Sequence, residues 1–171
     1  MPKSPLKPRI VFIAKFVIAL LGFYALVALN PVNDHVIVPF TEVIARAAGL
    51  LLRGIGENVE VAGTLIRLSR FTMDVKNGCN GVEAMLLLVA AILAFPASLR
   101  SQLIGLTIAS VAIQVLNLFR VSCLVWLGQH HREIFDFFHV AVWQSIVILA
   151  AISMFVLWSW KFAEKPVAQS R

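Results

Sequence analysis

Long apolar runs bounded by charged residues are the feature that most restricts the fold of this sequence. A helix needs roughly 20 apolar residues to cross a hydrocarbon core, because lipid offers no hydrogen-bond partner to an unpaired backbone amide. Four stretches meet this requirement, over residues 10–29, 81–97, 102–126 and 140–160. With 60% hydrophobic and 14% charged residues, the 171-residue chain is not an ordinary soluble protein. We expect an all-α integral membrane protein with four transmembrane helices in a single domain.

Residues 30–80 form the one long connection between predicted spans. Within it, Thr41 to Arg53 places apolar residues on one face, a periodicity typical of a short helix lying at the membrane surface. Apolar and polar residues alternate between 59 and 75, and Ala62-Gly63 is available for a turn. This pattern predicts a small strand pair.

Lysine and arginine are distributed unequally between the two sides of the predicted bundle. If the N-terminus is cytoplasmic, that side carries eight basic residues and one acidic residue, whereas the rest of the chain carries seven basic and eight acidic residues. The positive-inside rule therefore predicts that both termini are cytoplasmic and that residues 30–80 lie outside. The net charge of +6 is then a topology signal and no indication of nucleic-acid binding. The cytoplasmic set is Lys3, Lys7, Arg9, Lys15, Arg100, Lys161, Lys165 and Arg171, with Glu164.

The first run, residues 10–29, is interpreted as a retained helix, because it exceeds the roughly 7–15 apolar residues of a secretory signal.

This topology brings three reactive side chains from distant parts of the chain to the outer leaflet. Cys79 lies just before the second span, Arg120 near the end of the third, and His139 at the start of the fourth. A helix N-terminus and a nearby guanidinium both stabilise a thiolate. We therefore expect Cys79 to be a sulfur nucleophile whose pKa falls below the free value of about 8.5. The alternatives are a cysteine that only packs, a snorkelling arginine and an interfacial histidine.

Arg120 is the strongest single indication of function, because an arginine inside a span costs between about 2.5 and over 10 kcal/mol. Gln114, Asn117 and Arg120 recur every third residue, which predicts a polar stripe facing the bundle interior. Glu83 follows Cys79 by one helical turn, and Arg120 is its available cation. Glu83 either orients Arg120 or serves as a structural counter-ion.

The other cysteine and two further histidines are weaker candidates. Cys123, one turn beyond Arg120, is interpreted as a packing residue, with pairing to Cys79 as the lesser alternative. His130 and His131 lie on a polar stretch, and their adjacency is poor geometry for two metal ligands. The two cysteines form no CxxC pair. We expect no metal site and no cofactor.

Three sequence elements, in order, give the chain a family resemblance. Residues 77–81 (NGCNG) are similar to the C-x-G element of the exosortase and archaeosortase family, residues 117–121 (NLFRV) are similar to its N-x-x-R element, and His139 follows. The chain resembles that family over nearly its whole length after the first span, and most of all the small H-type exosortases. It departs from the larger exosortases in having fewer spans, and Asn80 stands where serine is common.

The resemblance implies a bacterial inner-membrane cysteine protease or transpeptidase with its active site facing the periplasm. Its partners would be the lipid bilayer and the C-terminal sorting tail of exported proteins, which consists of a short motif, a transmembrane helix and a basic end. Cys79 would form a thioester, Arg120 would support the oxyanion or the thiolate, and His139 would act as acid or base. The supporting residues would be Glu83, Asn117 and Asn80.

Two other classes remain open at this point. A membrane thiol-disulfide oxidoreductase normally needs two cysteine pairs, whereas this chain has two cysteines in total. A non-enzymatic transporter or assembly subunit would use the polar stripe to line a path or to bind a partner helix. Replacing Cys79 by serine would be nearly silent in a transporter, and an oxidoreductase would lose its activity without Cys123.

Overall fold

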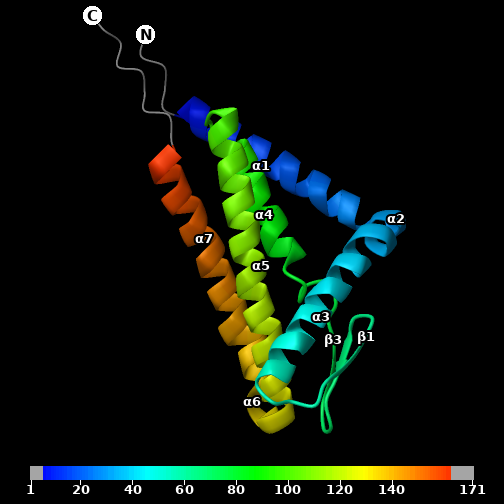
Figure 1. Cartoon of the computed structure of the whole chain (residues 1–171). Helices are drawn as coiled ribbons and strands as arrows, with labels where there is room; N and C mark the ends of the chain where they lie inside the picture. The colour runs from blue at the N-terminus through cyan, green and yellow to red at the C-terminus, as the bar shows by residue number, and fades with distance from the viewer. Residues whose placement is uncertain (1–5, 163–171) are drawn as a thin grey trace, which may run out of the picture.

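The chain is helical apart from one small sheet in the computed structural model, which describes residues 6–162 (Figure 1). Lys3, Glu164, Lys165 and Arg171, which were assigned to the cytoplasmic side, lie outside these residues. In the described part, four helices are long and apolar enough to cross a membrane: Arg9–Val27, Asn30–Gly54, Leu99–His130 and Arg132–Lys161. The apolar helix α4 (Val82–Ala94) is shorter. The expected all-α membrane protein is therefore confirmed.

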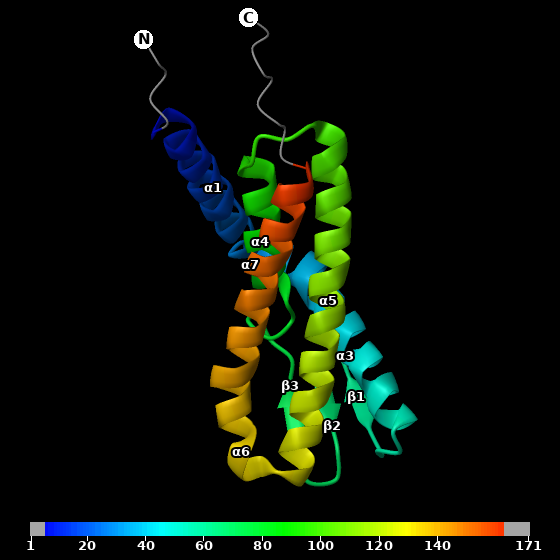
Figure 2. The same cartoon turned by 90° about the vertical axis from the view of Figure 1, so that its left-hand side faces the viewer.

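Helices α4, α5 (Leu99–His130) and α7 (Trp143–Phe162) pack together, and α1 (Leu6–Val27) lies against α4 (Figures 1 and 2). Their shared core contains Leu88, Ile92, Ile113, Ala151 and Trp158. The start of α1, the connection from α4 to α5 and the end of α7 lie at one end of the bundle, and the sheet and α6 (Arg132–Phe137) lie at the other (Figures 1 and 2).

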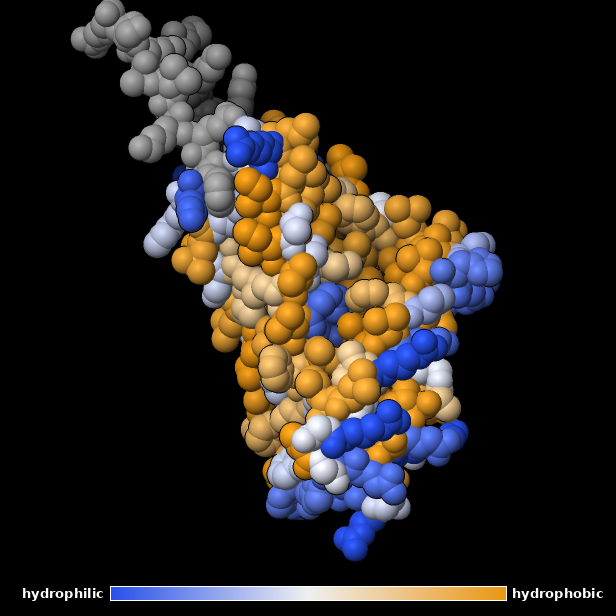
Figure 3. All heavy atoms as spheres, viewed as in Figure 1, coloured by the Kyte–Doolittle hydropathy of each residue, from blue (hydrophilic) through white to orange (hydrophobic). Residues whose placement is uncertain are grey.

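Hydrophobic and hydrophilic residues occupy different parts of the surface along the length of the bundle. Hydrophobic residues cover the helices over most of their length, and hydrophilic residues gather around α6, the sheet and the end of α3 (Val38–Gly54) (Figure 3). Exposed apolar side chains on the helices, among them Ile18, Leu21, Leu149 and Leu157, are what a lipid environment requires. The hydrophilic region therefore lies at the end of the bundle opposite to the start of α1 and the end of α7 (Figures 1 and 3).

The helix expected over residues 41–53 is present and begins earlier than expected. Helix α1 ends at Val27, and α2 (Asn30–Val32) begins with Pro31 in its first turn, where the missing N–H costs no hydrogen bond. A π-helical segment, η1 (Asn33–Ile37), joins α2 to α3. The apolar face of α3 packs against the sheet and α5 through Ile44, Ala45, Ala48 and Leu52. Helix α3 thereby anchors the segment between α1 and α4 to the bundle.

The small sheet has three antiparallel strands, β1 (Glu60–Ala62), β2 (Leu65–Arg67) and β3 (Thr72–Asp74), in the order β1-β2-β3. The expected strand pair is present, with the turn after Ala62, and β3 adds a third strand. Ile66 pairs with Val61 and Met73, and these three side chains join the core formed with α3 and α5.

Helices α5 and α7 lie where spans were expected at residues 102–126 and 140–160, with different ends. Helix α4, expected as the span 81–97, is shorter than the four candidate spans, whereas Asn30–Gly54, which contains the expected surface helix, is one of them. Helix α4 stops at Ala94, because the residue before Pro96 is extended, and its 13 residues span about 20 Å. Helix α5 has 32 residues, about 48 Å, and begins after the N-cap Ser98. Helix α6 and a second π-helical segment, η2 (Phe138–Val142), lead directly into α7.

Candidate active site

Cys79 lies in a tight turn between β3 and α4. Gly78 and Gly81, on either side of it, have φ angles of 87° and 77°, a region that favours glycine. The Cys79 N–H donates to the Lys76 carbonyl at 2.8 Å. Helix α4 begins at Val82, so Cys79 lies just before the helix, as the sequence predicted, and the turn presents its side chain.

Asn80 is fully buried and ties this turn to two helices. Its Oδ1 accepts from the Val82 N–H at the start of α4 (3.1 Å), and its Nδ2 donates to the Thr41 hydroxyl on α3 (2.9 Å) and to Asn77 Oδ1 (3.2 Å). Thr41 was not singled out from the sequence. Its only signal there was a polar residue at the start of an apolar helical face.

His139 reaches Cys79 from the far end of the chain. It lies on η2, and its Nε2 is 3.2 Å from the Cys79 Sγ. The Phe135 ring, one turn earlier, lies against the imidazole with 5.5 Å between ring centroids. A π-helical segment carries an extra residue in its turn and is frequent at functional sites. The local widening of the helix thus sets the direction in which the imidazole projects.

Arg120 and Glu83 both hydrogen-bond to the backbone of Gly78 in this turn, Arg120 as donor and Glu83 as acceptor. The buried Arg120, 4% exposed, donates through Nη1 to the Gly78 carbonyl at 3.3 Å, and Glu83 Oε1 accepts from the Gly78 N–H at 2.7 Å. An ion pair between Glu83 and Arg120, the partnership expected from the sequence, is not among those of residues 6–162. The Glu83 carboxylate binds a backbone N–H instead, because Gly78 lies within its reach.

Asn117 lies one turn before Arg120 on α5 and is also buried, as the polar stripe predicted. Its side chain fills the space beside Gly81, where an added Cβ would be 2.8 Å from Asn117 Cγ. Within the described residues, the Asn117 amide atoms and Arg120 Nε have no hydrogen-bond partner. Gln114, the third member of the stripe, donates to the Met85 sulfur at 3.9 Å. Polar side chains therefore line the interior between α4 and α5.

Burial raises the pKa of the Cys79 thiol above its ordinary value. The Arg120 charge acts in the opposite direction and lowers this pKa, and the Glu83 charge raises it, but burial is the largest influence. The expectation of a lowered pKa was therefore wrong, because the sulfur is partly desolvated. Burial therefore disfavours the thiolate form of Cys79.

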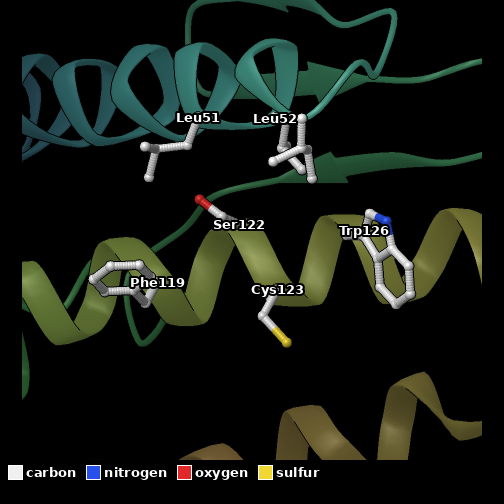
Figure 4. Close-up of a pocket in the computed structure, with 7 residues that line it drawn as sticks. Leu51, Leu52, Phe119, Ser122, Cys123 and Trp126 are labelled. Carbon is white, nitrogen blue, oxygen red and sulfur yellow. The ribbon is translucent and has the colours of Figure 1, made fainter.

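Cys123 belongs to a different part of the molecule. It lines an apolar pocket of about 300 Å³ between α3 and α5, together with Leu51, Leu52, Phe119 and Trp126 (Figure 4). Both cysteines are free, and Cys79 contacts His139 and not Cys123. This placement gives no support to a disulfide cycle between them.

His130 and His131 are likewise separate from Cys79. His130 Nε2 lies 2.6 Å from Glu57 Oε1, and His131 Nδ1 lies 3.6 Å from Glu133 Oε1. No group of three metal-binding side chains occurs within residues 6–162. The two histidines therefore make local contacts at the hydrophilic end of the bundle.

Comparison with known proteins identifies one family. The family model described as transmembrane exosortase matches residues 6–160, which include the Cys79 turn, the polar stripe and His139. No curated protein and no solved structure matches the chain. Because the match extends over nearly all of the sequence, the chain belongs to the transmembrane exosortase family.

Proposed function

We propose that the chain is a membrane-embedded cysteine transpeptidase or protease that cleaves the C-terminal sorting tail of exported proteins through a thioester on Cys79. Its family makes it a multi-pass membrane protein that processes sorting signals. The observation that carries the finer proposal is the 3.2 Å separation between Cys79 Sγ and His139 Nε2. This is the distance at which an imidazole accepts a proton from a thiol.

The first step is attack on the scissile carbonyl. His139 takes the thiol proton as Sγ forms its bond to the carbonyl carbon, and the carbonyl oxygen becomes an oxyanion. The raised pKa of Cys79 makes this base necessary, because little thiolate exists beforehand. Arg120, buried and fixed to the Gly78 carbonyl, supplies positive charge next to the reacting groups. Electrostatic support of this kind commonly amounts to a few kcal/mol.

The second step releases the tail. His139 returns its proton to the leaving amine as the carbon–nitrogen bond breaks, which leaves a thioester on Cys79. Water or an incoming amine then attacks the thioester, with His139 again accepting the proton and the Cys79 sulfur as leaving group. Asn80 and Glu83 act by fixing the Cys79 turn, and Asn117 acts by packing against Gly81 beneath it.

We assign the reaction to the periplasmic side of a bacterial inner membrane, with both termini cytoplasmic. This orientation is supported by the excess of basic residues at the end opposite to Cys79, where α1 starts and α7 ends (Figure 1). A tail with a transmembrane helix and a basic end would then lie in the same bilayer, parallel to the bundle. Its motif would be at the depth of Cys79.

The test is covalent trapping in the full-length protein in membranes. A tail substrate with an electrophilic group at the scissile position should label Cys79, as identified by mass spectrometry, and Cys79→Ala should abolish both labelling and tail processing. Cys123→Ala is the matched control and should retain both. Labelling at Cys123, or processing that survives Cys79→Ala, would refute the assignment.

A further inference from the structure

The two edge strands of the small sheet, β1 and β3, differ in the contacts that other residues make with their outer edges. At the β1 edge, Arg53 donates to the Val59 carbonyl through Nε (3.1 Å) and Nη2 (2.9 Å), and Val61 packs against Gly49 of α3. Covering an exposed edge in this way is how proteins prevent further strand pairing. At the β3 edge, Phe71, just before the strand, packs against Gly128 of α5 and Phe135 of α6, but among the described residues no side chain hydrogen-bonds to the backbone of β3 itself.

The outward backbone groups of β3 can be identified from its pairing with β2. The Val75 N–H donates to the Thr64 carbonyl, and the Leu68 N–H donates to the Phe71 carbonyl, so Phe71 and Val75 face β2. Backbone groups alternate in direction along a strand, and Met73 pairs with Ile66. The N–H and C=O groups of Thr72 and Asp74 therefore point away from the sheet. In the part of the chain that the structure describes, they have no hydrogen-bond partner.

This open edge continues directly into the Cys79 turn. Residues 75–78 are the whole connection between the end of β3 and Cys79, and the chain passes from there into α4 (Figure 1). A pocket of about 480 Å³ adjoins the connection and is lined by residues from three segments: Asn33, Val38, Thr41, Thr64, Asp74, Val75, Lys76 and Asn77. A peptide that paired with β3 would therefore run beside the segment that leads to Cys79.

We propose that the tail segment next to the scissile bond binds in extended form as a fourth strand on β3, which positions its carbonyl at Cys79. The inference rests on the proposed cysteine transpeptidase or protease function and adds how the substrate is held. Strand addition uses backbone hydrogen bonds, which give affinity that depends little on side chains, and leaves specificity to adjoining pockets. Here that pocket is the one beside Asn77.

An N-methyl scan of a synthetic tail substrate tests the proposal without altering the protein. Methylation removes one backbone donor at a time, and only alternate residues of an added strand donate to its neighbour. Processing by the wild-type protein in membranes should weaken roughly two- to tenfold at every second position, the size expected for one lost hydrogen bond. A flat profile, or losses without a period of two, would overturn strand addition.

Photocrosslinking tests whether the tail binds at the β3 edge of the sheet. In full-length Cys79→Ala protein, which holds but does not cleave the tail, a benzophenone amino acid replacing exposed Thr72 should crosslink to the tail. The same replacement of exposed Glu60 on β1 is the matched control and should give little product. Equal or stronger crosslinking from Glu60 would contradict the proposal. If trapping labels Cys79 while both tests fail, only strand addition is wrong; if trapping fails, the proposed function itself is wrong.

Discussion

The Cys79 sulfur and the His139 Nε2 lie 3.2 Å apart although 60 residues separate them in the chain. Neither residue lies in a regular α-helix. Cys79 occupies a glycine-flanked turn, and His139 projects from the π-helical segment that precedes α7. The regular helices around them thus hold these two irregular segments in place. Such an arrangement is typical of side chains that must meet at a fixed distance.

Replacing His139 should test its role as the proton acceptor. His139→Ala should slow tail processing by a factor of roughly 10² to 10⁴, the usual contribution of a general base, while the protein still inserts and folds. Immunoblots of substrate from cells that express each variant measure the rate. His131→Ala, at an exposed position paired with Glu133, is the control and should process normally. Equal activity of the two variants would remove His139 from the mechanism.

Gly81 should be intolerant of any side chain. Gly81→Ala introduces a Cβ 2.8 Å from Asn117 Cγ and requires a φ of 77°, so we expect destabilisation by about 1–3 kcal/mol. Thermal unfolding in detergent measures the change. Gly22→Ala, in the middle of α1 with no neighbouring atom within 4 Å of the added Cβ, should be neutral or stabilising. A double variant with Asn117→Ala should recover only the part of the loss caused by the collision.

Asn80 should behave as a single unit with Thr41. Asn80→Ala leaves the Val82 N–H without its partner and removes the bond that the buried Thr41 hydroxyl accepts, although that hydroxyl still donates to the Ile37 carbonyl, and should cost about 1–3 kcal/mol. Thr41→Val removes the other side of the same hydrogen bond. Because the two residues share it, the double variant should lose less stability than the two single variants together. Strict additivity in chemical unfolding would show that the Asn80–Thr41 contact carries no energy.

The sequence predicted which residues would meet more reliably than how they would interact. Hydropathy fixes the depth of each residue in a bilayer, and this placed Cys79, Arg120 and His139 at one end of the bundle. The interior direction of Asn117 followed from its spacing with Arg120. The role of Glu83 was left open by the sequence, because a backbone N–H such as that of Gly78 carries no sequence signal.

Local backbone geometry was the other source of error. The π-helical segment that aims His139 has no marker in its composition. The pKa of Cys79 is raised and not lowered, because burial of the sulfur outweighs the influence of the Arg120 charge. Helix α3 was found by its periodicity, but its packing against the sheet and α5 depends on contacts between distant segments.

The raised pKa of Cys79 gives a prediction with opposite signs for two variants. Thiolate is the reactive form, so alkylation of Cys79 by an uncharged haloacetamide should be slow at neutral pH and should increase as the pH rises toward a pKa above the ordinary thiol value. Glu83→Gln removes a charge that raises this pKa and should shift the profile to lower pH, whereas Arg120→Gln removes a charge that lowers it and should shift the profile to higher pH. Arg120→Lys keeps the charge and should stay close to the wild-type profile.

The rates should be measured in a Cys123→Ala background, so that only one thiol reacts. Shifts of the same sign in Glu83→Gln and Arg120→Gln would show that the two side chains act on Cys79 by holding Gly78 in place and not through their charges.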